Sequence, residues 1–258
     1  MSEMAKKIKI DTDVIKALYK KVFQDKYEKI LQDLLELEIE NPADIRVKHK
    51  IAEIHFRKNH VEESIAKYKE IAQYYEEEDF ILKAIDACKN ILKIRPELVD
   101  FNIKLSALYL KLGMTNEAAN QLRIAVNHYA GLGDSDKTVG LAQDLVKVDP
   151  SNENRAKLAE IYQSNGMREE AFKQYNVLAD SYRDKKDYDK LLHFYELLLP
   201  QKKDDGTLLR DVCILNLRKE NPQRVMKLLE QYKKLEDPEF KDLVNKAKLM
   251  MQVIRKGK

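Results

Sequence analysis

Apolar residues recur along this chain in a pattern that repeats every 53 or 54 residues. Three segments carry it, and they start at Lys50, Lys104 and Lys157: KIAEIHFRKNHVEESIAKYKEIAQYY, KLSALYLKLGMTNEAANQLRIAVNHY and KLAEIYQSNGMREEAFKQYNVLADSY. Within each segment, large apolar residues are spaced three and four positions apart, which places them on one face of an α-helix. Repeats of this length are typical of arrays whose neighbouring units stack to bury one continuous core. We therefore expect a protein that binds partners rather than one that catalyses a reaction.

Each segment contains two helices with a break between them. The aligned residues at the break are types that tolerate the left-handed conformation in which helices end: Asn59, Gly113 and Gly166. A column of small residues follows, and it lets the second helix approach the first closely: Ser64, Ala118 and Ala171. The pattern thus predicts a tight helical hairpin in every segment.

A third helical stretch follows each hairpin and stops at a proline, namely Pro96, Pro150 or Pro200. Proline cannot continue the backbone hydrogen bonds of a helix and disfavours helix in the residue before it, so these are helix ends. The N-terminal segment that ends at Pro42 matches this third helix, and residues 208–240 look like a degenerate fourth copy.

These observations predict a single all-α domain over residues 1–258, a right-handed helical-repeat solenoid of about 14 helices with a three-helix period. Its expected parts are N-terminal cap helices at 1–42, repeat units at 43–97, 98–150 and 151–203, and a degenerate C-terminal unit and cap at 204–258.

The repeat columns are similar to those of the tetratricopeptide repeat family. The residues that match the signature of that family in order are Leu158, Ala159, Tyr162, Gly166, Ala171, Tyr175 and Ala179, and its second-helix half recurs at Ala84, Cys88, Ile91 and Pro96. The resemblance covers about residues 25 to 235 and implies a superhelical surface that binds proteins or peptides. The unit departs from the family repeat of about 34 residues because it contains three helices. A looser likeness links residues 79–96 to the repeats of bacterial adaptor and regulatory proteins.

Charge argues against nucleic acid as the partner. The 47 basic and 44 acidic residues alternate along most helices, whereas phosphate binding needs concentrated basic charge. An RNA-binding helical-repeat protein is the alternative function, and it would need a polar code at a regular position. The corresponding column of Glu53, Ala107 and Glu160 does not supply one.

The ends of the chain and its composition favour a cytoplasmic protein. No run of 18 apolar residues could span a membrane, and the start, MSEMAKKIKID, carries Lys and Asp where a secretory signal needs an apolar core.

We find no motif that indicates catalysis, a cofactor or a metal. The five histidines fall in no metal-binding spacing, and GLGDSDKT lacks the GxxxxGK[ST] spacing of a phosphate loop. Cys88 and Cys213 occupy core columns, where thiols pack as small hydrophobes. We expect a protein that is not an enzyme, although distant helices could still bring a polar cluster together.

Residues off the core columns of the first helices predict the partner-binding groove. They are Arg46, His49, Phe56, Arg57, Ile103, Leu110, Lys111, Glu160, Gln163, Arg210 and Leu217. Apolar members such as Phe56, Ile103 and Leu110 would anchor an amphipathic helix or an extended peptide. The alternative is that these side chains pack on the third helices of adjacent units.

The sequence thus favours a non-enzymatic, cytoplasmic scaffold or adaptor that binds a partner protein or peptide. The last helix leaves one further alternative open, because its apolar residues can either cap the core or pair with a second chain in a homodimer. Those residues are Leu249, Met250, Met251 and Val253.

Overall fold

The computed structural model describes residues 12–256, and side chains from Lys26 to Arg255. This part of the chain contains α-helices, one short 3-10 helix and no strand, which confirms the all-α prediction. The elements are α1 (Thr12–Glu40), α2 (Ile45–Arg57), α3 (Val61–Glu77), α4 (Ile81–Ile94), α5 (Asp100–Lys111), α6 (Thr115–Leu132), α7 (Ser135–Val148), α8 (Asn152–Ser164), α9 (Arg168–Asp184), α10 (Tyr188–Leu198), α11 (Gly206–Arg218), α12 (Pro222–Gln231), η1 (Pro238–Phe240) and α13 (Lys241–Lys256).

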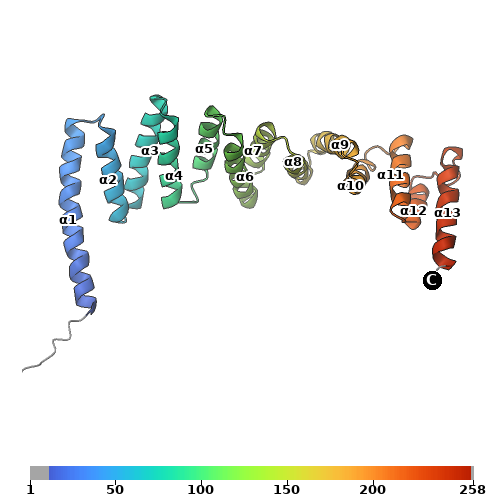
Figure 1. Cartoon of the computed structure of the whole chain (residues 1–258), viewed down its shortest axis with the longest axis horizontal. Helices are drawn as coiled ribbons and strands as arrows, with labels where there is room; N and C mark the ends of the chain where they lie inside the picture. Colours follow the sequence, from blue (N-terminus) through green and yellow to red (C-terminus); the bar gives the residue numbers. More distant parts are fainter. Residues whose placement is uncertain (1–11, 257–258) are drawn as a thin grey trace, which may run out of the picture. The chain divides into compact units, whose positions relative to one another are not determined.

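The chain forms two compact units, Met1–His128 and Tyr129–Lys258, and the division falls within α6. In the first unit, α1 to α4 each pack on the next helix along the chain, up to α5 (Figure 1). In the second unit, α7 to α13 do the same. Helices of one predicted repeat, such as α2, α3 and α4, pack more extensively than helices of different repeats, such as α4 and α5. The three-helix repeat is therefore visible in the packing.

The same turn closes every hairpin. In the first one, Asn59 adopts a positive φ of 62°, and the N–H of His60 donates to the carbonyl of His55. This pattern is the Schellman motif, which satisfies carbonyls at the end of a helix. Positive-φ residues follow the first helices at Asn59, Gly113, Gly166 and Glu220, and the second helices at Asp79, Gly133, Lys186 and Lys233. The breaks predicted at Asn59, Gly113 and Gly166 are thus confirmed, and the break at Glu220 is an additional one.

The prolines end helices as the sequence predicts. The helix ends that precede Pro42, Pro96, Pro150 and Pro200 are Glu40, Ile94, Val148 and Leu198. Each helix thus stops two residues before the proline. Before Pro96 and Pro150 the intervening residues, Arg95 and Asp149, have left the helical conformation, as expected next to proline. Before Pro200, Leu199 keeps helical backbone angles, and the helix ends at the proline itself.

The aligned columns form the core. Ile51, Leu105 and Leu158 are buried, and so are Ala118 and Ala171. Ser64 occupies the same column as these alanines, and its buried hydroxyl donates to the carbonyl of Ala52 at 2.8 Å. A polar residue is tolerated there because its hydrogen bond is made inside the hairpin.

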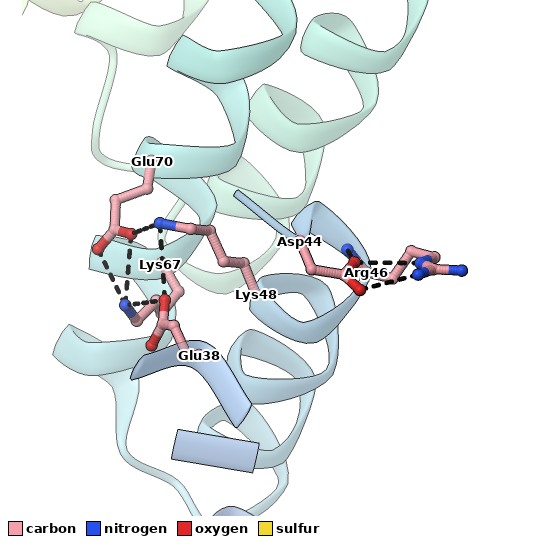
Figure 2. A network of polar contacts seen from close by, with 6 residues as sticks. All are labelled: Glu38, Asp44, Arg46, Lys48, Lys67 and Glu70. Carbon is pink, nitrogen blue, oxygen red and sulfur yellow. Dashed lines mark hydrogen bonds and ion pairs between the residues drawn. The ribbon is translucent and has the colours of Figure 1, made fainter. Parts of the chain in front are cut away.

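A network of ion pairs links α1 to the first hairpin (Figure 2). Glu38 of α1 accepts from Lys67 of α3 at 2.8 Å and lies 3.6 Å from the ammonium of Lys48 of α2. Both lysines also pair with Glu70 of α3, at 2.7 Å from Lys48 and 3.2 Å from Lys67. The Glu38 and lysine side chains are largely buried, so these charges are screened less than surface pairs.

Candidate partner-binding surface

Helices α2, α3 and α4 together form a hollow of about 350 Å³, here named the α2–α4 hollow. Its apolar lining comes from Phe56 of α2, Tyr68 of α3 and Ile94 of α4. Its polar lining consists of Glu53, Arg57, Asn90 and Lys93. The hollow exists because α2 and α4 both pack on α3, which places their C-terminal halves side by side. A mixed apolar and polar lining of this kind suits a side chain of a partner protein.

Phe56 is the apolar residue most open to solvent in this hollow, with 46% of its surface exposed. The repeat explains its position, because Ile51 and Ile54 of the same helix face the core and are buried. Tyr68 is half-buried, and burial raises the pKa of its phenol. Its hydroxyl therefore stays protonated at neutral pH.

Charged groups around the hollow are held in defined pairs. Arg57 donates to the hydroxyl of Tyr27 at 3.2 Å and to a carboxylate oxygen of Glu53 at 3.4 Å. The ammonium of Lys50 donates to the same carboxylate at 3.2 Å and, with Arg57, holds the pKa of Glu53 below its usual value. Lys93 lies exposed on the opposite wall. The lining itself contains two cations, Arg57 and Lys93, and one carboxylate, and therefore carries a surplus of positive charge.

The other two predicted residues of α2 lie outside this hollow's lining. Arg46 donates to the side chain of Asp44 at 3.0 and 2.8 Å, and these bonds lower the pKa of Asp44 to about 2. Asp44 is the N-cap of α2, so Arg46 supports the start of the helix (Figure 2). His49 is half-buried against the rings of Tyr68 and Tyr75, and burial lowers its pKa. Its imidazole is therefore neutral at neutral pH.

The predicted residues of α5 do not line the α2–α4 hollow. Leu110 is exposed and Ile103 is half-buried. Lys111 lies 3.7 Å from a carboxylate oxygen of Glu76, which pairs more closely with Lys104 at 2.7 Å.

Of the four predicted residues in the second unit, two are accessible, one is engaged in an ion pair and one is buried. Glu160 is exposed, and the hydroxyl of Tyr175 donates to Gln163 at 2.7 Å. Arg210 links α11 to α13, since it donates to both carboxylate oxygens of Asp242 at 3.1 and 2.6 Å. Leu217 is only 6% exposed, so the prediction that it faces a groove is wrong. This residue follows the buried Leu215 and Asn216 on α11, which is covered on more than one side by α10, α12 and α13.

The sequence analysis predicts neither Tyr68 of α3 nor the residues of α4 as part of the surface. Asn90, Lys93 and Ile94 lie on the third helix of the repeat, whereas the predicted groove uses first helices alone. The signal in the sequence is that α4 alternates buried residues with Asn90 and Lys93, which leaves a polar stripe along its C-terminal half.

Among the described side chains, from Lys26 to Arg255, no group of three or more His, Cys, Asp or Glu residues is arranged to hold a metal ion. None of the helices described is both long and apolar enough to cross a membrane.

Among known proteins, the chain is similar to solved structures. No family model matches the chain, and no curated protein sequence does. A tetratricopeptide repeat protein from Parabacteroides merdae is 14% identical, with 91% of this chain and 97% of that chain covered and a TM-score of 0.29. The Rap conjugation gene regulator of plasmid pLS20, in complex with the Phr* peptide, is 13% identical over 99% and 80% of the two chains, with a TM-score of 0.34.

The P58(IPK) tetratricopeptide domain is 12% identical over 95% of this chain and 100% of that one, with a TM-score of 0.26. At these TM-scores, the whole chains do not superpose closely. The hairpins, their turns and their small-residue columns are features of this chain itself. The chain is an all-α protein built of repeated helical hairpins.

Proposed function

We propose that this protein is a non-enzymatic scaffold that binds a partner protein or peptide through the α2–α4 hollow. The observation that carries the proposal is the lining of that hollow by residues of three consecutive helices, with Phe56 exposed at its wall. A preformed surface loses little conformational entropy when a partner binds, so a modest hollow can still give specific recognition.

The lining suggests the chemistry of the partner. An apolar side chain of the partner would contact Phe56 and Ile94, and a carboxylate beside it would meet Lys93 or Arg57. Such a ligand is an amphipathic helix or an extended peptide with an apolar residue next to an acidic one.

We further propose that the protein is a cytoplasmic adaptor of bacterial type whose repeats over residues 1–258 act as one domain. We also propose that it self-associates through α13, on which Leu249 and Val253 are exposed four residues apart. A mass near twice 30.2 kDa in solution, lost in a Val253→Glu variant, would support that pairing.

Affinity capture with the full chain tests the main proposal. The unaltered protein is compared with a Phe56→Ser variant as bait in native extracts, and captured proteins are identified by mass spectrometry. We expect a specific partner to be lost or strongly depleted with Phe56→Ser, since about 1.5 to 3 kcal/mol accompanies full burial of such a side chain.

Ile124→Ser is the matched control, because Ile124 has a similar exposed fraction of 48% but does not line the hollow. This variant should retain the partner. Equal capture by all three baits would contradict the placement of the site. Loss of all captured material after nuclease treatment would favour the alternative of an RNA-binding repeat protein.

A further inference from the structure

A second hollow of about 570 Å³ lies where α4 meets α5, and its walls are apolar. It is here named the α4–α5 hollow. Phe80, Leu82 and Leu112 line it with exposed fractions of 50%, 66% and 39%. The hollow lies at the N-terminal end of α4, whereas the α2–α4 hollow uses the C-terminal end of the same helix. The two surfaces are therefore separate.

Phe80 can be compared with the residues at the equivalent position of the other repeats. Phe80 is the N-cap of α4, and its side chain makes no capping hydrogen bond. The corresponding N-caps of α7 and α10 are Asp134 and Asp187, whose carboxylates accept from backbone N–H groups at 3.1 and 3.2 Å. Aspartate is a strongly preferred N-cap and phenylalanine is not. At position 80 the chain therefore lacks a stabilising cap and has an exposed aromatic ring instead.

Leu82 of α4 and the facing Leu112 at the end of α5 also differ from the residues at the equivalent positions of the other repeats. Where α1 meets α2, these positions hold an ion pair between Glu28 and Lys58. Where α10 meets α11, they hold the ion pair of Asp189 and Lys219, at 2.7 Å.

Where α7 meets α8, the same two positions hold Asp136 and Asn165, which line a hollow of about 370 Å³. Polar side chains thus occupy this place at three junctions, and leucines occupy it only between α4 and α5. The fold does not require apolar residues there. Exposed apolar clusters that the fold does not require mark interaction surfaces.

We propose that the α4–α5 hollow is a second docking site, and that its partner is a peptide segment with large apolar side chains next to an acidic residue. The cations of the lining are Lys83 and Lys111, of which Lys111 also lies 3.7 Å from the carboxylate of Glu76, and the single acidic residue of the lining is Asp79. The ammonium of Lys83 lies 4.8 Å from the centre of the Phe80 ring. A carboxylate beside the apolar side chains would meet this cation at the rim.

Charge also argues against a second copy of this chain as the occupant. The exposed apolar residues of α13, Leu249 and Val253, lie on a helix that carries Lys246, Lys248 and Arg255. Docking of α13 into a hollow with two lysines would bring like charges together, which disfavours that complex.

Selection from a displayed library of random peptides tests the proposal. The bait is the full chain, and the counter-bait is a Phe80→Asp, Leu82→Asp double variant. These substitutions introduce the residues that stand at positions 134 and 136, so the variant keeps a pattern that this fold already uses. We expect selected peptides to carry a large apolar residue within one helical turn of Asp or Glu.

The selected peptides should bind the double variant about tenfold more weakly or worse, because two apolar contacts are lost. An Ile124→Asp, Val177→Asp variant has the same change in charge at exposed apolar positions outside the hollow, and it should bind as the unaltered protein does. Phe56→Ser should also leave binding unchanged, which separates this site from the first. Equal affinity for both double variants, no enrichment, or enrichment of basic peptides would overturn the proposal.

Discussion

A left-handed residue follows each hairpin helix, and the strain at that position depends on the presence of a side chain. Gly113, Gly133 and Gly166 adopt φ near 72° without a Cβ atom. Lys186 and Glu220 occupy the equivalent positions with φ of 57° and 55°. A non-glycine residue in this region costs free energy that glycine avoids.

The Lys186→Gly variant should therefore be more stable than the unaltered protein, by about 0.5 to 1 kcal/mol. Urea-induced unfolding followed by circular dichroism measures this difference. Lys185→Gly is the matched control, since Lys185 has an ordinary helical φ of −76°. That variant should lose stability, and a gain in both variants would contradict the role of backbone strain.

The two thiols report on the packing of single residues. Burial raises the pKa of Cys88 to about 11 and that of Cys213 to about 12. Because the folded protein disfavours the thiolate, the stability that these groups contribute is fully present below pH 9. It is lost as the pH rises from there through the folded-state pKa values.

Both thiols should accordingly resist an aromatic disulfide reagent at pH 8 in the folded protein and react fully in urea. Absorbance of the released thiolate measures the reaction. Cys88→Ser and Cys213→Ser variants identify which thiol reacts. Rapid reaction without denaturant would contradict the burial of the thiol concerned.

Single positions differ in how well the sequence predicts them. The turns at Gly113 and Gly166 were predicted because glycine favours the left-handed region. The turn at Lys186 was missed, because lysine has no such preference; its positive φ accompanies a hydrogen bond from the N–H of Asp187 to the carbonyl of Tyr182. Leu217 was misplaced since the periodic pattern does not show that several helices cover α11.

At the scale of elements, α4 begins with a weaker cap than its counterparts in the other repeats. A Phe80→Asp substitution should stabilise the protein by about 1 kcal/mol by supplying the carboxylate that caps α7 and α10. Thermal unfolding measures the gain. Asp134→Ala should cost about the same amount, as its cap on α7 is lost. If Phe80→Asp destabilised the protein, the Phe80 ring would have a structural role that outweighs the cap.

The contact of α1 with the first hairpin depends on a carboxylate shared by two lysines. Glu38→Gln should reduce stability by about 1 kcal/mol, because it weakens the pairing of Lys48 and Lys67 in a largely buried place. Glu36→Gln on the same helix is the control, since Glu36 is exposed and makes no ion pair with the described side chains. Equal effects of the two substitutions in urea-induced unfolding would contradict the importance of the network.

Helix ends and the repeat period could be predicted because prolines and left-handed residues act locally. The α2–α4 hollow could be predicted only in part. Phe56 and Arg57 were included, yet Lys93 was not, because its place beside α2 follows from how both helices pack on α3. Such proximity depends on tertiary packing, which periodicity does not report.

At the scale of the whole molecule, the helices α1 to α5 of the first unit and α7 to α13 of the second pack mainly on their neighbours along the chain. Repeats of this kind contribute to stability through their own packing and their contacts with adjacent repeats. Local damage should therefore have local effects. An Ile91→Ala variant, which removes a fully buried side chain, should cost about 2 to 5 kcal/mol in the first unit.

Hydrogen exchange measured by mass spectrometry tests how far this damage spreads. Exchange should accelerate in α2, α3 and α4 and stay unchanged in α11 and α12. Leu229→Ala, at a fully buried position of α12, should show the reverse pattern. Equal acceleration along the chain in both variants would indicate that the protein unfolds as one cooperative body.

The hairpin turns also bear on how the chain folds as it is made. Every turn joins helices that are adjacent in the sequence, so the segments that must meet are synthesised one after the other. Contacts of low sequence separation form quickly, because little chain entropy is lost in bringing them together. The hairpin of α2 and α3 can therefore close while the second unit is still within or behind the ribosome exit tunnel, and each later helix adds to a surface that already exists.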